Sequence, residues 1–117
     1  MSVPTLIKRG EVWKVCLDPT VGDEIQKTRP CVVISADGIG RLRLKTIVPI
    51  TAPAKEQALW HVPVVPHSSN GLSKASVADA LQIRSLSHNR FVTRLGRLTA
   101  QQMDDVAAAV AIVLEIR

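Results

Sequence analysis

The sequence predicts a mainly β fold, a small barrel or curled sheet, with one α-helix at its C-terminal end. Short apolar segments alternate with turn-forming segments along most of the chain. The last segment instead repeats its apolar residues at the spacing of a helix. With 117 residues, the chain has the length of one domain, and we expect 1–117 to form a single unit.

Three strands are expected in the first half of the chain. Residues 11–17 are rich in β-branched and aromatic side chains, and residues 30–36 form a nearly continuous apolar run expected at the sheet centre. The third expected strand is 44–50, where Pro49 predicts an edge position or a bulge. The connection at 18–28 is long, and long loops on compact domains tend to be functional.

The second half of the chain is expected to add shorter strands at 60–65, within 75–86 and at 91–98. These segments are separated by polar, turn-rich stretches. A loop at 51–58 follows the third strand.

The C-terminal helix is expected to begin at Thr99, because Thr99 and Gln102 fit a capping box. Its apolar residues recur on one helical face, which we expect to pack on the sheet. These residues are Met103, Val106, Ala107, Val110, Val113 and Leu114. Ala109, Ile112 and Ile116 lie off that face, and we hypothesise that a partner subunit covers them.

The net charge of +5 favours a polyanionic partner, because neutralising phosphates releases condensed counterions. Two basic groups stand out, one at 84–97, which contains no carboxylate, and one formed by Arg41, Arg43 and Lys45. Solvated strand faces are the alternative interpretation. With three aromatic residues and no tyrosine, a base-stacking platform is not expected.

Neither a metal site nor a membrane segment is expected. Cys16 and Cys31 lack zinc-ligand spacing, and acidic residues do not cluster, so we expect no metal and no cofactor. No apolar run is long enough to cross a bilayer and no secretory pattern opens the chain, so we expect a cytoplasmic protein.

Six segments together resemble the MazF/PemK (Kid) family of toxins, the mRNA interferases of type II toxin–antitoxin systems. In order they are KRGEVW at 8–13, DPTVGDE at 18–24, KTRPCVV at 27–33, VPIT at 48–51, QIRS at 82–85 and RLGRL at 94–98. The resemblance spans essentially the whole chain and implies an SH3-like small β-barrel. It also implies a homodimer that cleaves single-stranded RNA at short sequences and is neutralised by an acidic, partly disordered, MazE-like antitoxin. Operator DNA is an expected partner of the toxin–antitoxin complex.

RNA cleavage without a metal is chemically reasonable, because RNA carries its own nucleophile. Attack by the 2′-hydroxyl would leave a 2′,3′-cyclic phosphate and a 5′-hydroxyl. The enzyme must then hold the phosphate in line and neutralise charge on its oxygens.

Arg29 is the first candidate catalytic residue, because a guanidinium forms a planar fork suited to two phosphate oxygens. From the residues alone, an ion pair of Arg29 with Glu24 or Asp23 is an equal alternative; the resemblance implies the catalytic role. It also implies that Thr51 anchors the phosphate beside Arg29. Glu24 either accepts the 2′-hydroxyl proton or orients Arg29. Some relatives carry a histidine at the position of Asp23, so the general base is unassigned here.

The resemblance also suggests RNA-binding residues. Lys27 and Thr28 precede Arg29 and are expected to line the groove, while Gln82 is expected to read a base edge and Arg84 to hold a backbone phosphate. Leu81 stands where relatives commonly have an acidic residue, which puts the base preference in doubt. His61, His67 and His88 are expected to be surface residues without a catalytic role.

Two rival functions belong to other classes. A CcdB-type gyrase inhibitor shares the fold and acts by contact with a protein, but its determinants lie near the C-terminus rather than at Arg29 and Thr51. A non-catalytic nucleic-acid-binding repressor subunit would bind RNA without producing cyclic-phosphate ends.

Overall fold

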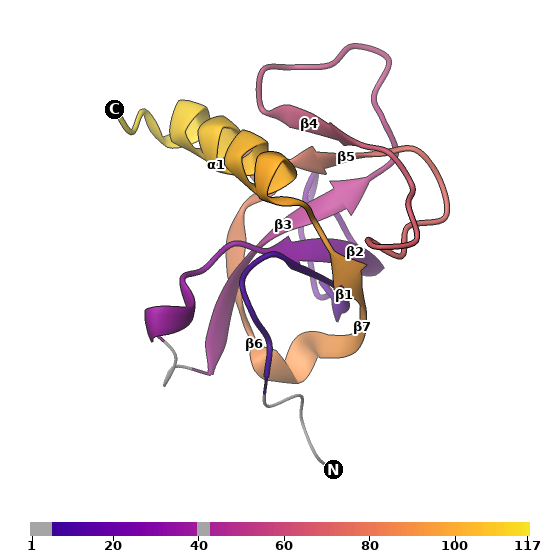
Figure 1. Cartoon of the computed structure of the whole chain (residues 1–117), viewed down its shortest axis with the longest axis vertical. Coiled ribbons are helices and arrows are strands. Elements are labelled where there is room, and N and C mark those ends of the chain that lie inside the picture. The colour runs from indigo at the N-terminus through magenta and orange to yellow at the C-terminus, as the bar shows by residue number, and fades with distance from the viewer. Residues whose placement is uncertain (1–5, 40–42) are drawn as a thin grey trace.

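The computed structural model describes residues 6–39 and 43–117, so Arg41 of the expected basic group lies outside the described residues (Figure 1). The strands are β1 Glu11–Cys16, β2 Thr28–Val33, β3 Leu44–Thr51, β4 His61–Val64, β5 Ser76–Asp79, β6 Arg84–Ser87 and β7 Phe91–Arg97. Three 3-10 turns, η1 Asp37–Ile39, η2 Ala80–Gln82 and η3 His88–Arg90, precede the helix α1 Ala100–Leu114. The predicted fold class, mainly β with a C-terminal helix, is confirmed.

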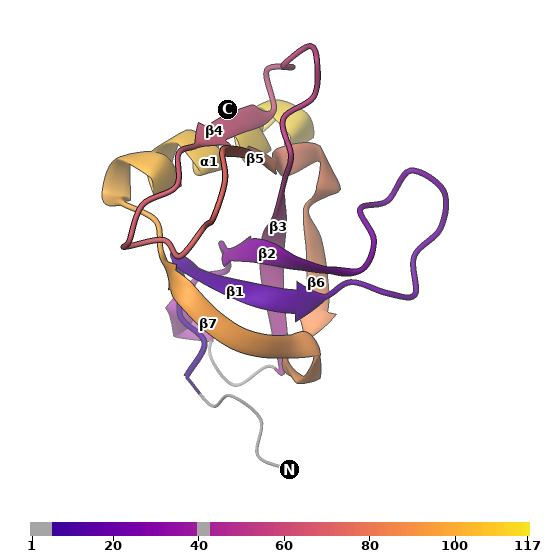
Figure 2. The same cartoon turned by 90° about the vertical axis from the view of Figure 1, so that its right-hand side faces the viewer.

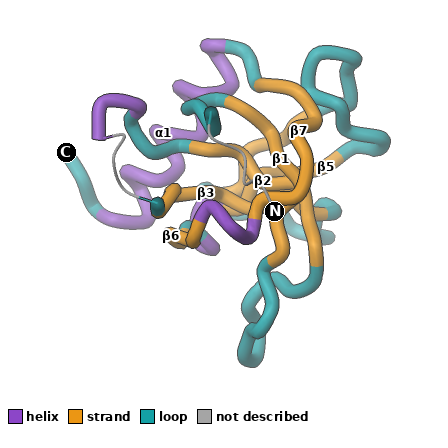
Figure 3. The backbone as a smooth tube through the Cα atoms, turned by 90° about the horizontal axis from the view of Figure 1, so that it is seen from below, coloured by secondary structure: helices purple, strands orange, loops and turns teal. Residues whose placement is uncertain are grey.

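The strands form one antiparallel sheet in the order β4-β5-β3-β2-β1-β7, and β6 also pairs with β3. Figure 2 shows this sheet curling, with β1, β2 and β7 on one side and β4 and β5 beside α1. Seen from below, the strands gather at the centre and loops project around them (Figure 3). The small curled sheet expected from the sequence is therefore present.

β3 lies at the centre of this arrangement. One of its edges pairs with β2, while the other pairs first with β6 over 44–47 and then with β5 over 50–51. Pro49 falls between these two partners, where β3 is paired with neither β5 nor β6. Proline has no N–H to donate, so this gap is a suitable place for it. Pro49, for which an edge position or a bulge was predicted, thus marks the point where β3 changes its partner strand from β6 to β5.

The segment at 75–86 forms two strands rather than one strand and its exit. A short turn separates β5 from β6, and the Asp79 side chain caps it by accepting a hydrogen bond from Leu81 N–H at 3.1 Å. The second strand also differs from its predicted bounds, since β2 begins at Thr28, which pairs with Cys16 of β1.

Both faces of the central strands are buried, which explains their nearly continuous apolar sequence. One face packs under α1, with Val12, Val32 and Val48 alternating from three neighbouring strands. The opposite face encloses a second cluster, in which the Trp13 and Phe91 rings meet edge to face at 5.9 Å. The helix and the curl of the sheet therefore each cover one face.

The helix begins with the predicted capping box. Thr99 Oγ1 accepts from Gln102 N–H at 3.1 Å, and Gln102 Oε1 accepts from Thr99 N–H at 2.8 Å. The predicted packing face is wrong in part, because Ala109 is buried on the sheet while Ala107 and Leu114 are exposed. The face is therefore Met103, Val106, Ala109, Val110 and Val113. Within the described residues, no helix is long and apolar enough to cross a membrane.

A buried carboxylate, Glu11, ties the start of the sheet to its last strand. Its side chain accepts from Lys8 N–H at 2.8 Å, from the Trp13 indole at 3.1 Å and from Arg94 Nε at 2.7 Å. Burial alone would raise the pKa of Glu11, but these three hydrogen bonds and the charge of Arg94 together lower it below its ordinary 4.5. The ionised form is therefore the one that the fold stabilises.

We predict that Glu11→Gln lowers the free energy of unfolding at about pH 7 by about 1–3 kcal/mol, because a neutral amide cannot satisfy three donors in this geometry. Because its pKa is lowered in the folded state, Glu11 contributes stability above 4.5 that is lost as the pH falls through the folded-state value. Urea unfolding between about pH 7 and about pH 3 measures both effects. The variant should lose less stability on acidification than the wild type, and an equal loss would contradict the prediction.

Candidate active site

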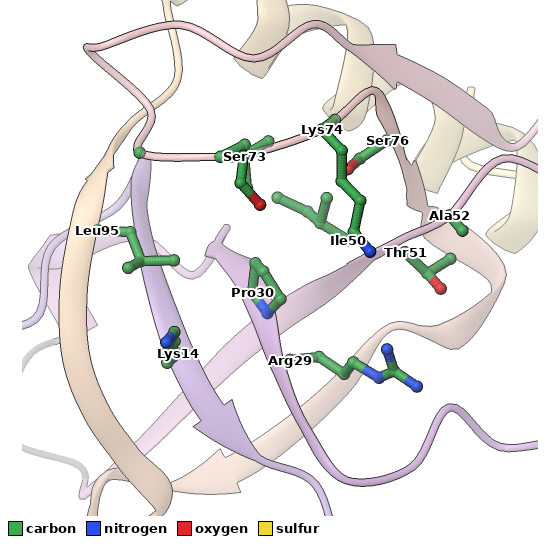
Figure 4. A pocket seen from close by; sticks show the side chains of 12 residues that line it. Lys14, Arg29, Pro30, Ile50, Thr51, Ala52, Ser73, Lys74, Ser76 and Leu95 are labelled. Carbon is green, nitrogen blue, oxygen red and sulfur yellow. The ribbon is translucent and has the colours of Figure 1, made fainter.

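The pairing of β2 with β3 brings Arg29 and Thr51 to the same place. Cys31 of β2 pairs with Pro49 of β3, and Arg29 and Thr51 lie two residues beyond this pair, back along β2 and forward along β3. Both residues line one pocket of about 310 Å³. In Figure 4 the Thr51 hydroxyl points toward the side on which the Arg29 guanidinium lies.

This pocket is suited to an anion. It contains three cationic side chains and three hydroxyls, and its described lining has no carboxylate. The lining residues are Lys14, Arg29, Pro30, Ile50, Thr51, Ala52, Gly71, Leu72, Ser73, Lys74, Ser76 and Leu95. A half-enclosed site with fixed positive charge favours phosphate over neutral ligands.

Arg29 is half-buried and is held by the loop that precedes it. Its Nε donates to the carbonyl of Gln26 at 3.0 Å, which leaves the two terminal nitrogens for a ligand. Among the residues that the structure describes, Arg29 forms no ion pair. The alternative ion pair with Glu24 or Asp23 is therefore not formed.

Glu24 lies on the same loop but does not contact the Arg29 guanidinium by an ion pair. Its carboxylate accepts from Val21 N–H at 2.7 Å, and its own N–H donates to the Val21 carbonyl at 3.2 Å. Glu24 thus fastens the turn at the tip of the loop. Asp23, its neighbour, is exposed.

Lys27 and Thr28 are exposed at the end of this loop, next to Arg29. Lys27 has a φ of +71°, a left-handed conformation that costs a residue with a side chain about 1–2 kcal/mol. The Lys27 carbonyl accepts from Leu17 N–H at 2.9 Å, which closes the two ends of the loop on each other.

Gln82 and Arg84 both face the loop between β1 and β2. Gln82 accepts from Ile25 N–H at 3.2 Å and donates to the Asp23 carbonyl at 3.1 Å. Arg84 Nη1 donates to the Leu17 carbonyl at 3.1 Å. Neither residue lines the pocket around Arg29.

Sequence patterns did not indicate Lys14, Ser73 or Lys74, which complete the pocket. Lys14 is the exposed residue of an otherwise buried stretch of β1, a break in the apolar pattern that could have marked it. Ser73 and Lys74 come from the loop between β4 and β5, and Figure 4 shows the Lys74 side chain extending into the pocket. No local pattern predicts that this loop folds over the β2–β3 edge.

A buried asparagine and two glycines hold that loop in place. The Asn70 side chain accepts from His67 N–H and Leu72 N–H at 3.1 and 3.0 Å and donates to the Val65 carbonyl at 2.9 Å. Gly71, with φ +70°, packs so tightly that an added Cβ would lie 2.3 Å from the Leu95 carbonyl oxygen. A Cβ on Gly96 would lie 2.2 Å from the carbonyl oxygen of Ser69. The loop backbone therefore lies directly against β7.

The histidines and cysteines lie outside this pocket. His61 accepts from Ala58 N–H at 2.9 Å and lies 3.7 Å from Asp79, and His67 bonds within its own turn. Burial raises the pKa of the Cys31 thiol to about 12, although the charge of Arg84 lowers it in part. Among the described residues, no three His, Cys, Asp or Glu side chains are grouped as metal ligands would be.

Comparison with known proteins assigns the family. Residues 8–114 match the model of the PemK-like, MazF-like toxin of type II toxin–antitoxin systems. The chain belongs to this family. The family's fold agrees with the curled sheet and C-terminal helix described above.

Individual relatives agree with this membership over nearly the full chain. Endoribonuclease MazF9 of Mycobacterium tuberculosis is 30% identical over 117 residues, which cover 95% of this chain and 98% of the relative. The structure of MazF from Deinococcus radiodurans superposes with a TM-score of 0.79 at 24% identity, covering 99% of this chain and 100% of that one. A mycobacterial endoribonuclease in complex with its cognate antitoxin gives 0.76 at 18% identity, with 96% and 98% covered.

Proposed function

We propose that this chain is the toxin of a type II toxin–antitoxin pair, an endoribonuclease that cleaves single-stranded RNA, with 1–117 as one toxin domain. The observation that carries the proposal is the shared pocket of Arg29 and Thr51, which is cationic and lacks a carboxylate. The name endoribonuclease borne by the mycobacterial relative supports the same activity.

In the proposed reaction the 2′-oxygen of the RNA attacks the adjacent phosphorus and the bond from phosphorus to the 5′-oxygen breaks. The 2′-hydroxyl gives up its proton and the departing 5′-oxygen gains one, so the ends are a 2′,3′-cyclic phosphate and a 5′-hydroxyl. The free terminal nitrogens of Arg29 neutralise the charge that builds on the phosphate oxygens. The Thr51 hydroxyl donates a hydrogen bond to the same phosphate.

In place of proton transfer or direct orientation of Arg29, we assign Glu24 an indirect supporting role. It fixes the loop turn through Val21, and the same loop supplies the Gln26 carbonyl that orients Arg29. The described lining of the pocket contains no carboxylate or histidine, so the proton of the 2′-hydroxyl passes to water, and water supplies the proton that the 5′-oxygen gains.

The proposed RNA-binding residues are Lys27, Thr28, Gln82 and Arg84. Lys27 and Thr28 are exposed beside Arg29, so they can meet the RNA directly. Within the described residues, Arg84 binds the loop backbone through Nη1, so its other donors are available for a phosphate. Lys14 and Lys74 extend this cationic path from the pocket.

The proposed partners follow from the basic surface and the family. An acidic MazE-like antitoxin would cover the same groove as the RNA, and the complexed mycobacterial relative supports such a partner. The pair would bind operator DNA. A second copy of the chain would cover the outer face of α1, and the cytoplasm, where mRNA is translated, is the proposed location.

We predict that Arg29→Ala loses about 3 kcal/mol or more of transition-state stabilisation, about a hundredfold or more in rate. The measurement is cleavage of a defined pool of single-stranded RNA with EDTA present, followed by mapping of both ends. Arg97→Ala, which removes the same charge from an exposed position of β7, is the matched control.

Near-wild-type cleavage by folded Arg29→Ala would defeat the assignment of Arg29. If the wild type leaves the RNA intact, the proposed endoribonuclease activity is wrong. The two non-catalytic functions, gyrase-type inhibition and nucleic-acid binding, would then be favoured. Ends other than cyclic phosphate and 5′-hydroxyl would defeat the reaction route.

We predict that Lys74→Ala weakens RNA binding and reduces the slope of log affinity against log salt by about 0.7, the value for one phosphate contact on a single strand. RNA carrying 2′-O-methyl groups allows binding to be measured without cleavage. Lys8→Ala removes an exposed lysine outside the pocket and should leave the slope unchanged. An unchanged slope in Lys74→Ala would remove Lys74 from the RNA path.

We predict that Ile112→Asp converts a homodimer into a monomer. Ile112 is 49% exposed on the outer side of the helix, and Ile116, which follows the end of the helix, is 61% exposed. A charge at position 112 would be costly in an apolar interface. Sedimentation should give twice the chain mass of 12.7 kDa for the wild type and the single mass for the variant. Ala107→Asp places the same charge on another side of the helix and should remain dimeric; a monomeric wild type would contradict the prediction.

A further inference from the structure

Three polar side chains from the segment between β5 and β7 hold the backbone of the β1–β2 loop, residues 17–27. We propose that Arg90, together with Arg84 and Gln82, is a positioning residue that fixes this loop so that Arg29 keeps its orientation. We call these three residues the loop clamp. The role in catalysis rests on the proposed function, whereas the clamp itself is a feature of the fold.

Arg90 holds the start of the loop. Its Nη1 donates to the Cys16 carbonyl at 3.2 Å and also to the carbonyl of Asp18. Cys16 is the last residue of β1, so Arg90 fixes the chain at the point where it leaves the sheet. Arg90 reaches this point from 72 or more residues further along the chain, which no local sequence pattern indicates.

Gln82 and Arg84 hold the rest of the loop. Arg84 binds the carbonyl of Leu17, next to the two carbonyls bound by Arg90. Gln82 binds the returning strand of the loop at Asp23 and Ile25, through one acceptor and one donor. The clamp therefore contacts both the outgoing and the returning halves.

The contacts lead to Arg29 through Gln26. The Gln26 carbonyl orients the Arg29 guanidinium and is flanked by Ile25 and Lys27. Ile25 is bound to Gln82, and Lys27 is bound to Leu17, whose carbonyl is bound to Arg84. The peptide that orients the catalytic fork thus lies between two clamped residues.

Apolar packing alone does not hold this loop. It projects away from the sheet (Figure 2), and Val21 at its tip is 80% exposed. Its described apolar contacts with the second core cluster lie near its two ends, at the buried Leu17 and the partly buried Ile25. A projecting chain with little buried apolar surface gains its order from hydrogen bonds. Because a displacement of about 1 Å in a positioning group can cost about a hundredfold in rate, loosening the loop should be visible in catalysis.

The test compares Arg90→Met with the wild type. Methionine keeps an apolar stem and removes every donor, so we expect kcat to fall about tenfold to a hundredfold while KM changes little. Amide hydrogen exchange at Leu17 and Ile25 should accelerate, while exchange in β3 stays unchanged. Arg90→Lys, which keeps the charge and one donor group, should recover part of both losses.

Arg97→Met is the matched control, because it removes an arginine from the far end of β7 and should change neither readout. A higher KM with unchanged kcat would make Arg90 an RNA contact and overturn the positioning role. Unchanged exchange at Leu17 and Ile25 would overturn the clamp, as would faster exchange without any loss of kcat.

Two further outcomes separate the clamp from the proposed function. If the wild type leaves RNA intact, the proposed function fails and hydrogen exchange alone decides whether the clamp exists. If Arg90→Met does not fold, Arg90→Lys, with its single donor group, supplies the comparison. A wild-type kcat together with wild-type hydrogen exchange at Leu17 and Ile25 in Arg90→Lys would overturn the proposal.

Discussion

The antiparallel pairing of β2 with β3 is the constraint on which the candidate site depends. Its register ends at Cys31 and Pro49, and Arg29 and Thr51 lie two residues beyond this pair, where both line the pocket. A slip of one residue would send either side chain to the opposite face of the sheet. Buried valines on both strands prevent such a slip, because both faces of this part of the sheet lie in a core.

Different interactions hold the sheet and the loops of this molecule. The sheet and α1 are held by apolar burial, which is strong and non-directional. The loops that surround the pocket are held by directed hydrogen bonds, from Asn70 on one side and from the loop clamp on the other. The rigid sheet thus places the site residues, and polar contacts fix the loops around them. Each of these hydrogen bonds is directional but contributes only modest free energy.

The sequence predicted the parts of this structure that depend on local patterns. Short apolar segments rich in β-branched residues, separated by turn-forming segments, located the strands, and Thr99 with Gln102 located the start of the helix. Ala109 was misplaced because a helical periodicity of small residues does not fix which side turns inward. Arg29 and Thr51 were found through the family motif, whereas Lys74 and Arg90 were not implicated in the site, since their partners are distant in the sequence.

The pairing of β1 with β7 also has a consequence for how the protein is made. β1 is synthesised before β7, so its outer edge stays unpaired until residues 91–97 exist. The ion pair between Glu11 and Arg94 likewise cannot form until Arg94 has been synthesised. A nascent chain that is still inside the ribosome at β7 therefore cannot complete the sheet. The sheet of this endoribonuclease therefore closes only after residues 91–97 have been synthesised and can pair with β1.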